Sequence, residues 1–246
     1  MLSQEENELL TPVGPGTPAG ELLRRYWHPV AVADELTAER PKKRLRILGE
    51  DLILFRDQSG QYGLLAEHCS HRGASLYYGF VEENGLRCAY HGWKYDVSGK
   101  CLEQPFEPKE ASFREKVCHR AYPVQRLAGL LFAYLGPQPT SLLPRWDLLV
   151  REDGTRTITA LPLHDCNWLQ AMENSVDPVH TYYLHGHTMR MKGLPGGEYY
   201  YRPIEALTFE EVSQPAWAGI LKKRVFKGEE GNERETGHPL VFPNIL

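Results

Sequence analysis

The stretch from Glu67 to Tyr95 reads EHCSHRGASLYYGFVEENGLRCAYHGWKY, and two short loops within it decide the fold. The first loop is Cys69-Ser70-His71, the second is Cys88-Ala89-Tyr90-His91, and residues 72–87 separate them. Each loop offers one thiolate and one imidazole. The pattern therefore indicates a metal site assembled from the tips of two β-hairpins.

Two iron ions fit this spacing better than one zinc ion. Chelation of a single tetrahedral zinc through Cys-x-His would strain the backbone, whereas such a close pair can straddle two adjacent irons. In a Rieske centre two cysteines hold one iron and two histidines hold the other, and the neutral imidazoles raise the reduction potential. We predict a [2Fe-2S] cluster on Cys69, His71, Cys88 and His91, with a zinc-stabilised β module as the alternative.

Small residues and one aromatic residue flank the two loops. Arg72-Gly73-Ala74-Ser75 follows the first loop and Gly92-Trp93 follows the second. Small residues let backbone amides approach sulfur, and Trp93 would shield the cluster from water. His68 lies outside the ligand pattern and is interpreted as a surface or packing residue. The remaining cysteines have no histidine at ligand spacing and are assigned to packing: Cys101, Cys118 and Cys166.

Closely spaced strand patterns on both sides of the loops predict a small antiparallel all-β domain over residues 43–138. The strand candidates are residues 45–48, 52–55, 62–65, 86–95 and 124–135, and the first two are expected to form a hairpin with its turn at residues 49–51. Residues 1–42 are expected to form an N-terminal arm with a short helix at Glu21–Tyr26, which ends before His28-Pro29.

A proline-rich connector at residues 137–147 leads into a second region, residues 139–246, where the pattern changes. The candidates there are a strand at 155–163, a helix at 168–184 and strands at 199–209 and 219–226. Because helical and extended patterns alternate in this region, the fold class predicted for the whole chain is α+β.

The composition excludes some partners. Charged residues make up 24% of the chain and the formal net charge is -4, so no global positive field exists to hold nucleic acid or an anionic membrane. The most apolar stretch, Leu127–Leu135, is far shorter than the roughly 20 residues that cross a bilayer. The acidic N-terminus lacks the pattern of a secretory signal, so a cytoplasmic location is expected.

A second candidate metal site lies in residues 173–187, which read ENSVDPVHTYYLHGH. Asp177 and Pro178 are suited to the N-cap and first position of a helix. On an ideal helix His180 and His185 point about 140° apart, so they share a metal only if the helix distorts or ends between them, and Gly186 favours an ending. Two histidines with a carboxylate are typical of non-haem iron(II), although histidines also cap and pack.

Taken together, these residues resemble the α subunit of Rieske non-haem iron aromatic-ring oxygenases, most closely the phthalate dioxygenase branch. The likeness rests on GPGTPAGELLRRYWHPV (residues 14–30), CSHRGASL (69–76), CAYHGWKYD (88–96) and NSVDPVHTYYLH (174–185). It implies a small antiparallel all-β Rieske domain followed by part of a helix-grip-like α+β catalytic domain.

The resemblance also implies roles for individual residues. Cys69 and Cys88 would hold the outer, redox-inert iron, and His71 and His91 the iron that changes valence. His180 and His185 would bind the catalytic Fe(II). Asp177 would bridge His180 to a Rieske histidine of a neighbouring subunit as an electron-transfer conduit, and Asn174 would be a polar residue near the metal.

The sequence departs from the family at the third iron ligand. Relatives supply an aspartate late in the catalytic domain, and no position before the final HPLVFPNIL matches it. Four glutamates could substitute, but none lies in a supporting motif: Glu198, Glu205, Glu210 and Glu211. We therefore expect a C-terminally truncated sequence whose third carboxylate ligand is not in this chain.

The function implied by the resemblance is that of a terminal oxygenase component. Electrons from NADH would pass through a separate flavin and iron–sulfur reductase to the cluster and then to Fe(II), which would activate O2 for attack on an aromatic substrate. The outcome would be dihydroxylation, monohydroxylation or oxidative demethylation, and a homotrimer is implied. The alternative is a Rieske electron carrier without oxygenase activity, because the third ligand is missing.

Overall fold

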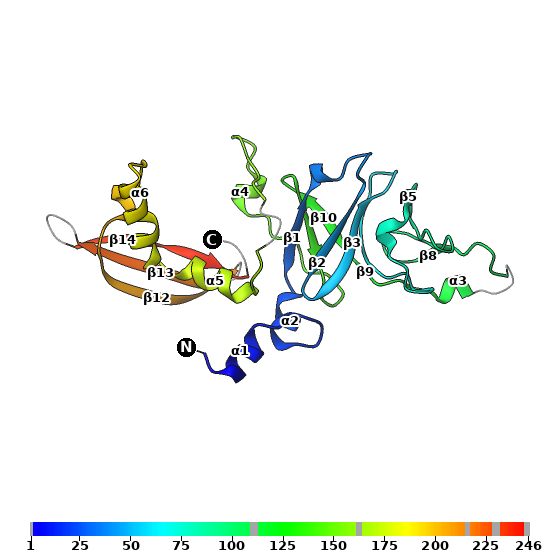
Figure 1. Ribbon diagram of the computed structural model, residues 1–246, viewed down its shortest axis with the longest axis horizontal. Coiled ribbons are helices and arrows are strands. Elements are labelled where there is room, and N and C mark those ends of the chain that lie inside the picture. The colour runs from blue at the N-terminus through cyan, green and yellow to red at the C-terminus, as the bar shows by residue number, and fades with distance from the viewer. Residues whose placement is uncertain (1, 109–112, 161–163, 215–216, 228–231, 244–246) are drawn as a thin grey trace. The chain divides into compact units, whose positions relative to one another are not determined.

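The structure is a computed structural model that describes residues 2–108, 113–160, 164–214, 217–227 and 232–243. The chain divides into two compact units, Met1–His164 and Asp165–Leu246, which Figure 1 shows with their helices and strands labelled. Among the described residues, no helix combines the length and the apolar character needed to cross a bilayer.

In its described residues the first unit contains three antiparallel sheets, ordered β1-β11-β10, β2-β3-β4-β9 and β5-β6-β7-β8. Its strands are β1 (Trp27–Val32), β2 (Lys42–Ile47), β3 (Glu50–Arg56), β4 (Tyr62–Ala66), β5 (Phe80–Glu82), β6 (Gly85–Arg87), β7 (Lys94–Tyr95), β8 (Cys101–Glu103), β9 (Ala121–Tyr122), β10 (Val124–Leu127) and β11 (Leu130–Tyr134). Its helices are α1 (Gln4–Leu10), α2 (Pro18–Leu23), η1 (Ala33–Glu35), η2 (Leu76–Tyr78), α3 (Phe113–Lys116) and α4 (Asp147–Val150).

The predicted hairpin at residues 45–55 is present as β2 and β3, paired in register from Lys42↔Phe55 to Ile47↔Glu50. The two turn residues, Leu48 and Gly49, both have positive φ angles, 46° and 78°. A two-residue turn of this kind matches the twist of the strands that it joins. The sequence pattern therefore predicted the hairpin, but it placed the turn at residues 49–51, whereas Glu50 and Asp51 belong to β3 and pair with β2.

Strand β3 is buried on both faces and separates two hydrophobic clusters. Leu52 and Leu54 pack into one cluster with residues of β4 and β11. Ile53 and Phe55 point the other way, into the cluster that contains Cys69 and Cys88. Successive side chains of a strand alternate between faces, so one strand lines both cores. The loops that carry the metal-site motif are thus packed directly on the central strand of the unit.

The N-terminal region contributes more than an arm. The expected helix at Glu21–Tyr26 is α2, which begins earlier. Thr17 is its N-cap and accepts a hydrogen bond from the Gly20 amide, and Pro18 occupies the first helical position. The following strand β1 pairs antiparallel with β11. The sequence missed this strand because its partner lies about a hundred residues further along the chain, and a local pattern cannot report such a pairing. The expected domain boundaries remain a prediction.

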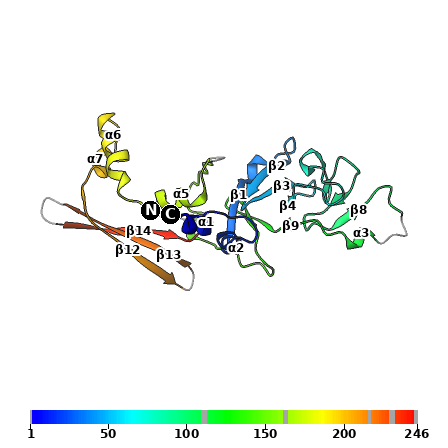
Figure 2. The same cartoon turned by 60° about the horizontal axis from the view of Figure 1, so that its bottom comes forward.

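The second unit combines helices with one antiparallel sheet, ordered β12-β13-β14. Figures 1 and 2 show its helical segment running along one face of this sheet. Its elements are α5 (Trp168–Val176), the π-helix η3 (Thr181–His187), α6 (Thr188–Met191), α7 (Gly197–Tyr200), β12 (Ile204–Gln214), β13 (Trp217–Lys227) and β14 (Asn232–Val241). Together with the β-rich first unit, this arrangement confirms the predicted α+β class.

Several expected elements of this region differ in the structure. Residues 155–160 form no regular strand, and residues 161–163 of that expected strand lie outside the described ranges. The expected helix 168–184 is interrupted between α5 and η3. The expected strand at 199–209 begins only at Ile204, because α7 occupies residues 197–200. The strand expected at 219–226 is present as part of β13.

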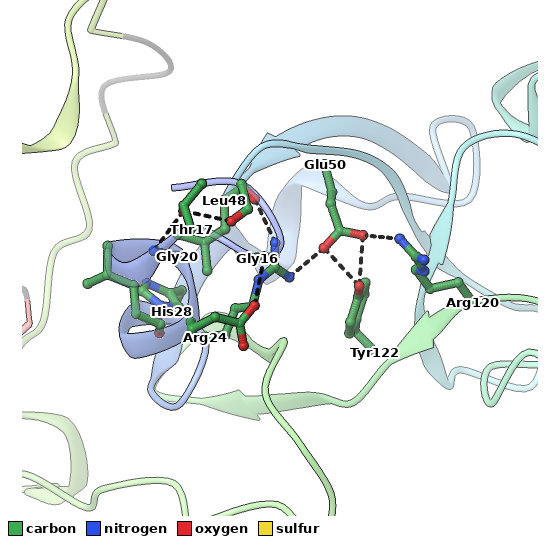
Figure 3. A network of polar contacts seen from close by, with 12 residues as sticks. Gly16, Thr17, Gly20, Arg24, His28, Leu48, Glu50, Arg120 and Tyr122 are labelled. Carbon is green, nitrogen blue, oxygen red and sulfur yellow. Dashed lines mark hydrogen bonds and ion pairs between the residues drawn. The ribbon is translucent and has the colours of Figure 1, made fainter. Parts of the chain in front are cut away.

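A buried ionic network joins the N-terminal helix to the central sheet (Figure 3). The carboxylate of Glu50, at the start of β3, accepts hydrogen bonds from Arg24, from Arg120 at 2.9 Å and from the Tyr122 hydroxyl at 2.8 Å. Arg24 also donates to the Leu48 carbonyl at 2.8 Å. Burial opposes the ionisation of Glu50, but these donors outweigh it and lower the pKa of the carboxyl group.

We expect Glu50→Ala to lower the free energy of unfolding by about 3–5 kcal/mol, because it leaves the guanidinium of Arg24 buried without its carboxylate. The side chains of Arg24 and Glu50 are only 7% and 9% exposed. Urea denaturation followed by circular dichroism would measure the loss.

Arg46→Ala is the matched control on the same hairpin. Its ion pair with Asp51 joins side chains that are 69% and 43% exposed, so its removal should cost less than about 1 kcal/mol. Equal losses in the two variants would contradict the role given to Glu50.

Candidate metal centres

The loop that begins at Cys69 is closed by two backbone hydrogen bonds. The amide of Gly73 donates to the Cys69 carbonyl at 2.9 Å, and the amide of Cys69 donates to the Ala74 carbonyl at 2.9 Å. Gly73 has a φ of +70°, a conformation that costs other residues roughly 1–2 kcal/mol. His68 lies beside this turn, with Nδ1 at 3.0 Å from the Gly73 carbonyl.

The loop that begins at Cys88 repeats this geometry. The amide of Gly92 donates to the Cys88 carbonyl at 3.0 Å, and the amide of Cys88 donates to the Trp93 carbonyl at 2.8 Å. Gly92 has a φ of +72°, and a Cβ atom there would lie 3.1 Å from Cγ of Pro105. Each loop therefore requires a glycine four residues after its cysteine.

The two loops bring the imidazoles of His71 and His91 together. Their ring centroids are 4.6 Å apart. Trp93 stacks on His71 at 4.5 Å with the rings within 5° of parallel, as its predicted shielding role requires, and Tyr90 lies 3.8 Å from His91. Nδ1 of both histidines is buried and has no hydrogen-bond partner among the described residues. Because buried polar atoms are nearly always satisfied, these two nitrogens fit a bound metal.

The thiols of Cys69 and Cys88 lie deeper than the imidazoles. Both cysteines are 3% exposed, whereas both histidines are partly exposed. Burial, followed by the adjacent Cys69 thiol, raises the pKa of the Cys88 thiol. The burial reverses one expectation from the sequence: an iron held by the two cysteines would be the inner iron of the cluster, and the iron on the two histidines would lie nearer the surface.

The four side chains form two pairs: the thiols of Cys69 and Cys88 are adjacent, and the ring centroids of His71 and His91 are 4.6 Å apart. A tetrahedral zinc would need four ligands around one point, whereas a Rieske cluster needs a thiolate pair and an imidazole pair. The arrangement therefore fits the two-iron cluster better than the zinc alternative.

Two residues beside this centre were not singled out from the sequence. The hydroxyl of Tyr95, which is fully buried, lies 3.2 Å from Sγ of Cys69. Nδ1 of His119 lies 2.7 Å from Oγ of Ser70. Tyr95 is within the CAYHGWKYD motif, but tyrosine is not a ligand type of this cluster, so the ligand spacing does not point to it. His119 has no local signal, since it reaches Ser70 only through the fold.

The other candidate residues divide between surface and core. His68 is exposed, as expected. Cys101 is 1% exposed and packs in the cluster around Ile53 and Phe55, as predicted. Cys118 and Cys166 are exposed, so the packing role assigned to these two was wrong. The absence of a histidine at ligand spacing excludes a shared metal motif, but it does not imply burial.

Asp177 organises the turn between α5 and η3. It ends α5 as the C-cap, and its Oδ1 accepts the Val179 amide at 2.7 Å. Its Oδ2 lies 3.1 Å from Nδ1 of His180. Burial opposes the ionisation of Asp177, but the Val179 amide and the His180 ring outweigh it and lower the carboxyl pKa. The helix expected to start at Pro178 begins at Thr181.

The π-helix explains how two histidines five residues apart can face one point. Its i→i+5 hydrogen bonding places residues five apart above one another, unlike the α-helix. The rings of His180 and His185 are 5.3 Å apart at their centroids. Gly186 does not end the helix as expected. It is buried, and a Cβ atom there would lie 2.6 Å from the Tyr201 amide nitrogen, so it allows close packing instead.

No carboxylate completes this second site within the described residues. Glu198 pairs with Arg190 at 3.0 Å, and Glu210 pairs with Lys223 at 2.5 Å. Glu205 and Glu211 are exposed on β12, and Asn174 is exposed on α5. The structure therefore supports a pair of imidazoles with a hydrogen-bonded aspartate, and it offers no substitute among the four glutamates.

The chain is similar in sequence to known proteins. A profile described as Rieske [2Fe-2S] domain matches residues 26–123. The 5,5'-dehydrodivanillate O-demethylase oxygenase subunit of Sphingobium sp. (strain NBRC 103272 / SYK-6) is 49% identical over 203 residues, which cover 80% of this chain and 47% of that protein. The phthalate 4,5-dioxygenase oxygenase subunit of Pseudomonas putida is 40% identical over 189 residues, covering 75% and 42%.

Solved structures show the same fold. The terminal oxygenase of carbazole 1,9a-dioxygenase from Nocardioides aromaticivorans IC177 aligns with a TM-score of 0.64 at 20% identity, covering 96% of this chain and 62% of that one. This likeness confirms the fold class stated from the sequence, and the domain match and the named relatives bear out the resemblance. The chain spans about half the length of the curated relatives it matches.

We expect His91→Ala to leave a folded chain that loses the visible absorbance and the electron paramagnetic resonance signal of a Rieske cluster. The reason is that one iron would lose an imidazole ligand that the structure holds 4.6 Å from His71. His68→Ala removes a neighbouring but exposed histidine and should keep both signals. An unchanged spectrum in His91→Ala would contradict the assignment.

Proposed function

We propose that the chain belongs to the Rieske non-haem iron oxygenases and acts in a terminal oxygenase component on an aromatic substrate; its Rieske [2Fe-2S] domain match and its identity to oxygenase subunits support this. The cofactors are a [2Fe-2S] cluster and Fe(II). The observation that carries the proposal is the pair of buried imidazole nitrogens of His71 and His91, which have no partner in the described structure, beside two buried cysteines.

The cluster would be held by Cys69 and Cys88 on the inner iron and by His71 and His91 on the outer iron. When bound, the two metal centres would supply electron transfer and the activation of O2. Trp93 covers one face of His71 and excludes water from it. The Tyr95 hydroxyl is placed to donate to Cys69 Sγ, and hydrogen bonds to cluster sulfurs tune the potential.

His180 and His185 would provide the two imidazole ligands of Fe(II). His180 is the N-cap of the π-helix and His185 lies within it, and such helices occur frequently at functional sites. Asp177 would orient His180 by accepting from Nδ1, which leaves Nε2 as the metal-binding nitrogen. As a carboxylate with a lowered pKa it stays ionised, so it can also accept from a second imidazole. This second bond, to a Rieske histidine of a neighbouring subunit, is part of the proposal.

The partners follow from the same role. We infer that electrons come from an NADH-dependent flavin and iron–sulfur reductase, and that the protein is cytoplasmic and homotrimeric. A related carbazole 1,9a-dioxygenase oxygenase has been solved in complex with a ferredoxin. The relatives named above act, by their names, on dehydrodivanillate and on phthalate. An aromatic substrate is therefore proposed, with hydroxylation or oxidative demethylation as the outcome.

One observation favours a second candidate, a Rieske electron carrier without oxygenase activity. Among the described residues, no carboxylate joins His180 and His185 in a three-ligand set, and iron bound by two imidazoles alone would be held weakly. The two candidates differ in the number of irons and in their behaviour with O2.

Metal analysis of the full chain, reconstituted with iron and sulfide, tests the proposal. We expect three irons per chain and consumption of O2 after reduction, because both centres would be loaded. Two irons, with O2 left untouched by the reduced protein, would establish the electron carrier instead. Zinc in a colourless protein would exclude both.

We predict that Asp177→Asn retains both metal centres but slows oxidation of the reduced cluster by O2 in a single turnover, because an amide cannot accept from two imidazoles as a carboxylate does. Stopped-flow absorbance of the cluster would measure the rate. Glu173→Gln, a carboxylate lost from the exposed side of α5, serves as the control and should keep the wild-type rate. A wild-type rate in Asp177→Asn would remove Asp177 from this role.

A further inference from the structure

His119 is a buried histidine that lies outside both ligand motifs. It is 2% exposed, and its amide donates to the Gly99 carbonyl at 2.8 Å, in the turn between β7 and β8. Its Nε2 lies 2.9 Å from the Ala66 carbonyl oxygen, and its Nδ1 lies 2.7 Å from Oγ of Ser70. One imidazole thus links the end of β4 to the loop that carries Cys69 and His71.

The partners of His119 fix the positions of two protons. A carbonyl oxygen only accepts, so Nε2 carries the hydrogen, and Nδ1 of the neutral ring is then an acceptor. The Ser70 hydroxyl must donate to it. Burial lowers the pKa of His119, which favours the neutral ring. Because the single hydroxyl hydrogen of Ser70 is directed to His119, it is not directed to a sulfur atom.

The same imidazole also packs on the ring of Tyr95, whose hydroxyl contacts a sulfur. The rings of His119 and Tyr95 are stacked, with centroids 4.6 Å apart and an interplanar angle of 29°. The Tyr95 hydroxyl lies 3.2 Å from Cys69 Sγ. A phenol carries an O–H donor, so at this distance Tyr95 can donate to a thiolate. The stack restricts the tilt of the phenol ring.

We propose that His119 is a positioning residue that sets the reduction potential of the cluster through Tyr95, an inference that rests on Cys69 being a cluster ligand. A hydrogen bond to a ligating sulfur stabilises the reduced, more negative cluster and raises its potential. His119 holds the Tyr95 donor on the sulfur and holds the Ser70 loop at a fixed distance from it. Loss of the imidazole would loosen both.

The test is an optical redox titration of the full chain loaded with its cluster. We expect His119→Leu to lower the equilibrium constant of one-electron reduction about tenfold, which corresponds to about 59 mV. Tyr95→Phe should also lower it, because the donor is removed. In the Tyr95→Phe background His119→Leu should add no further shift, since a double-mutant cycle reports whether two residues act through one contact.

His28→Leu is the matched control. His28 is also bonded through Nε2 to a backbone carbonyl, that of Leu23 at 2.8 Å, and burial lowers its pKa, but it lies in β1. Its loss should leave the potential unchanged. If His119→Leu fails to retain the cluster, His119→Gln decides the question, because glutamine can donate to Ala66 but offers no ring to Tyr95.

The outcomes separate this inference from the proposed function. A wild-type potential in the His119 variants, an additive shift in the double variant, or an equal shift in His28→Leu would each overturn the role of His119 while leaving the cluster in place. Absence of any Rieske-type signal in the wild-type chain would refute the cluster itself, and with it the proposed function.

Discussion

Two buried imidazole nitrogens that no described protein group satisfies are the constraint on which the first unit depends. Leaving such atoms unpaired costs free energy, so the fold must hold the rings of His71 and His91 where a metal can reach them. The surrounding contacts do this: glycines in the left-handed region close each loop, and Trp93 stacks on one ring. Beneath them, the two cysteines lie in a packed core.

Much of this centre could be predicted from the sequence because its ligand residues lie close together in the chain at a characteristic spacing. The four ligand candidates, the β2–β3 hairpin and the α+β class all follow from short patterns. What could not be predicted depends on distant contacts. The pairing of β1 with β11, the depth of the cysteines relative to the histidines, and the reach of His119 to Ser70 join segments far apart in the chain, and no periodicity reports them.

The second centre shows a different limit. On an ideal α-helix the side chains of His180 and His185 point in different directions, so the sequence predicted that the helix distorts or ends between them. The structure has a π-helix here, within which Gly186 packs closely against Tyr201. Propensity does not predict this geometry, because π-helices are rare and are stabilised by tertiary contacts. Neither the sequence pattern nor the described residues identify a third ligand for the iron on His180 and His185.

The position of β3 between two cores has a consequence for how the first unit melts. Leu52 and Leu54 belong to one core and Ile53 and Phe55 to the other, so neither core can come apart while this strand stays in place. The cluster-bearing end and the sheet beside the N-terminal helix should therefore unfold cooperatively, in a single transition. Oxidative damage at the iron–sulfur centre would then destabilise the whole unit and make all of it more susceptible to proteases.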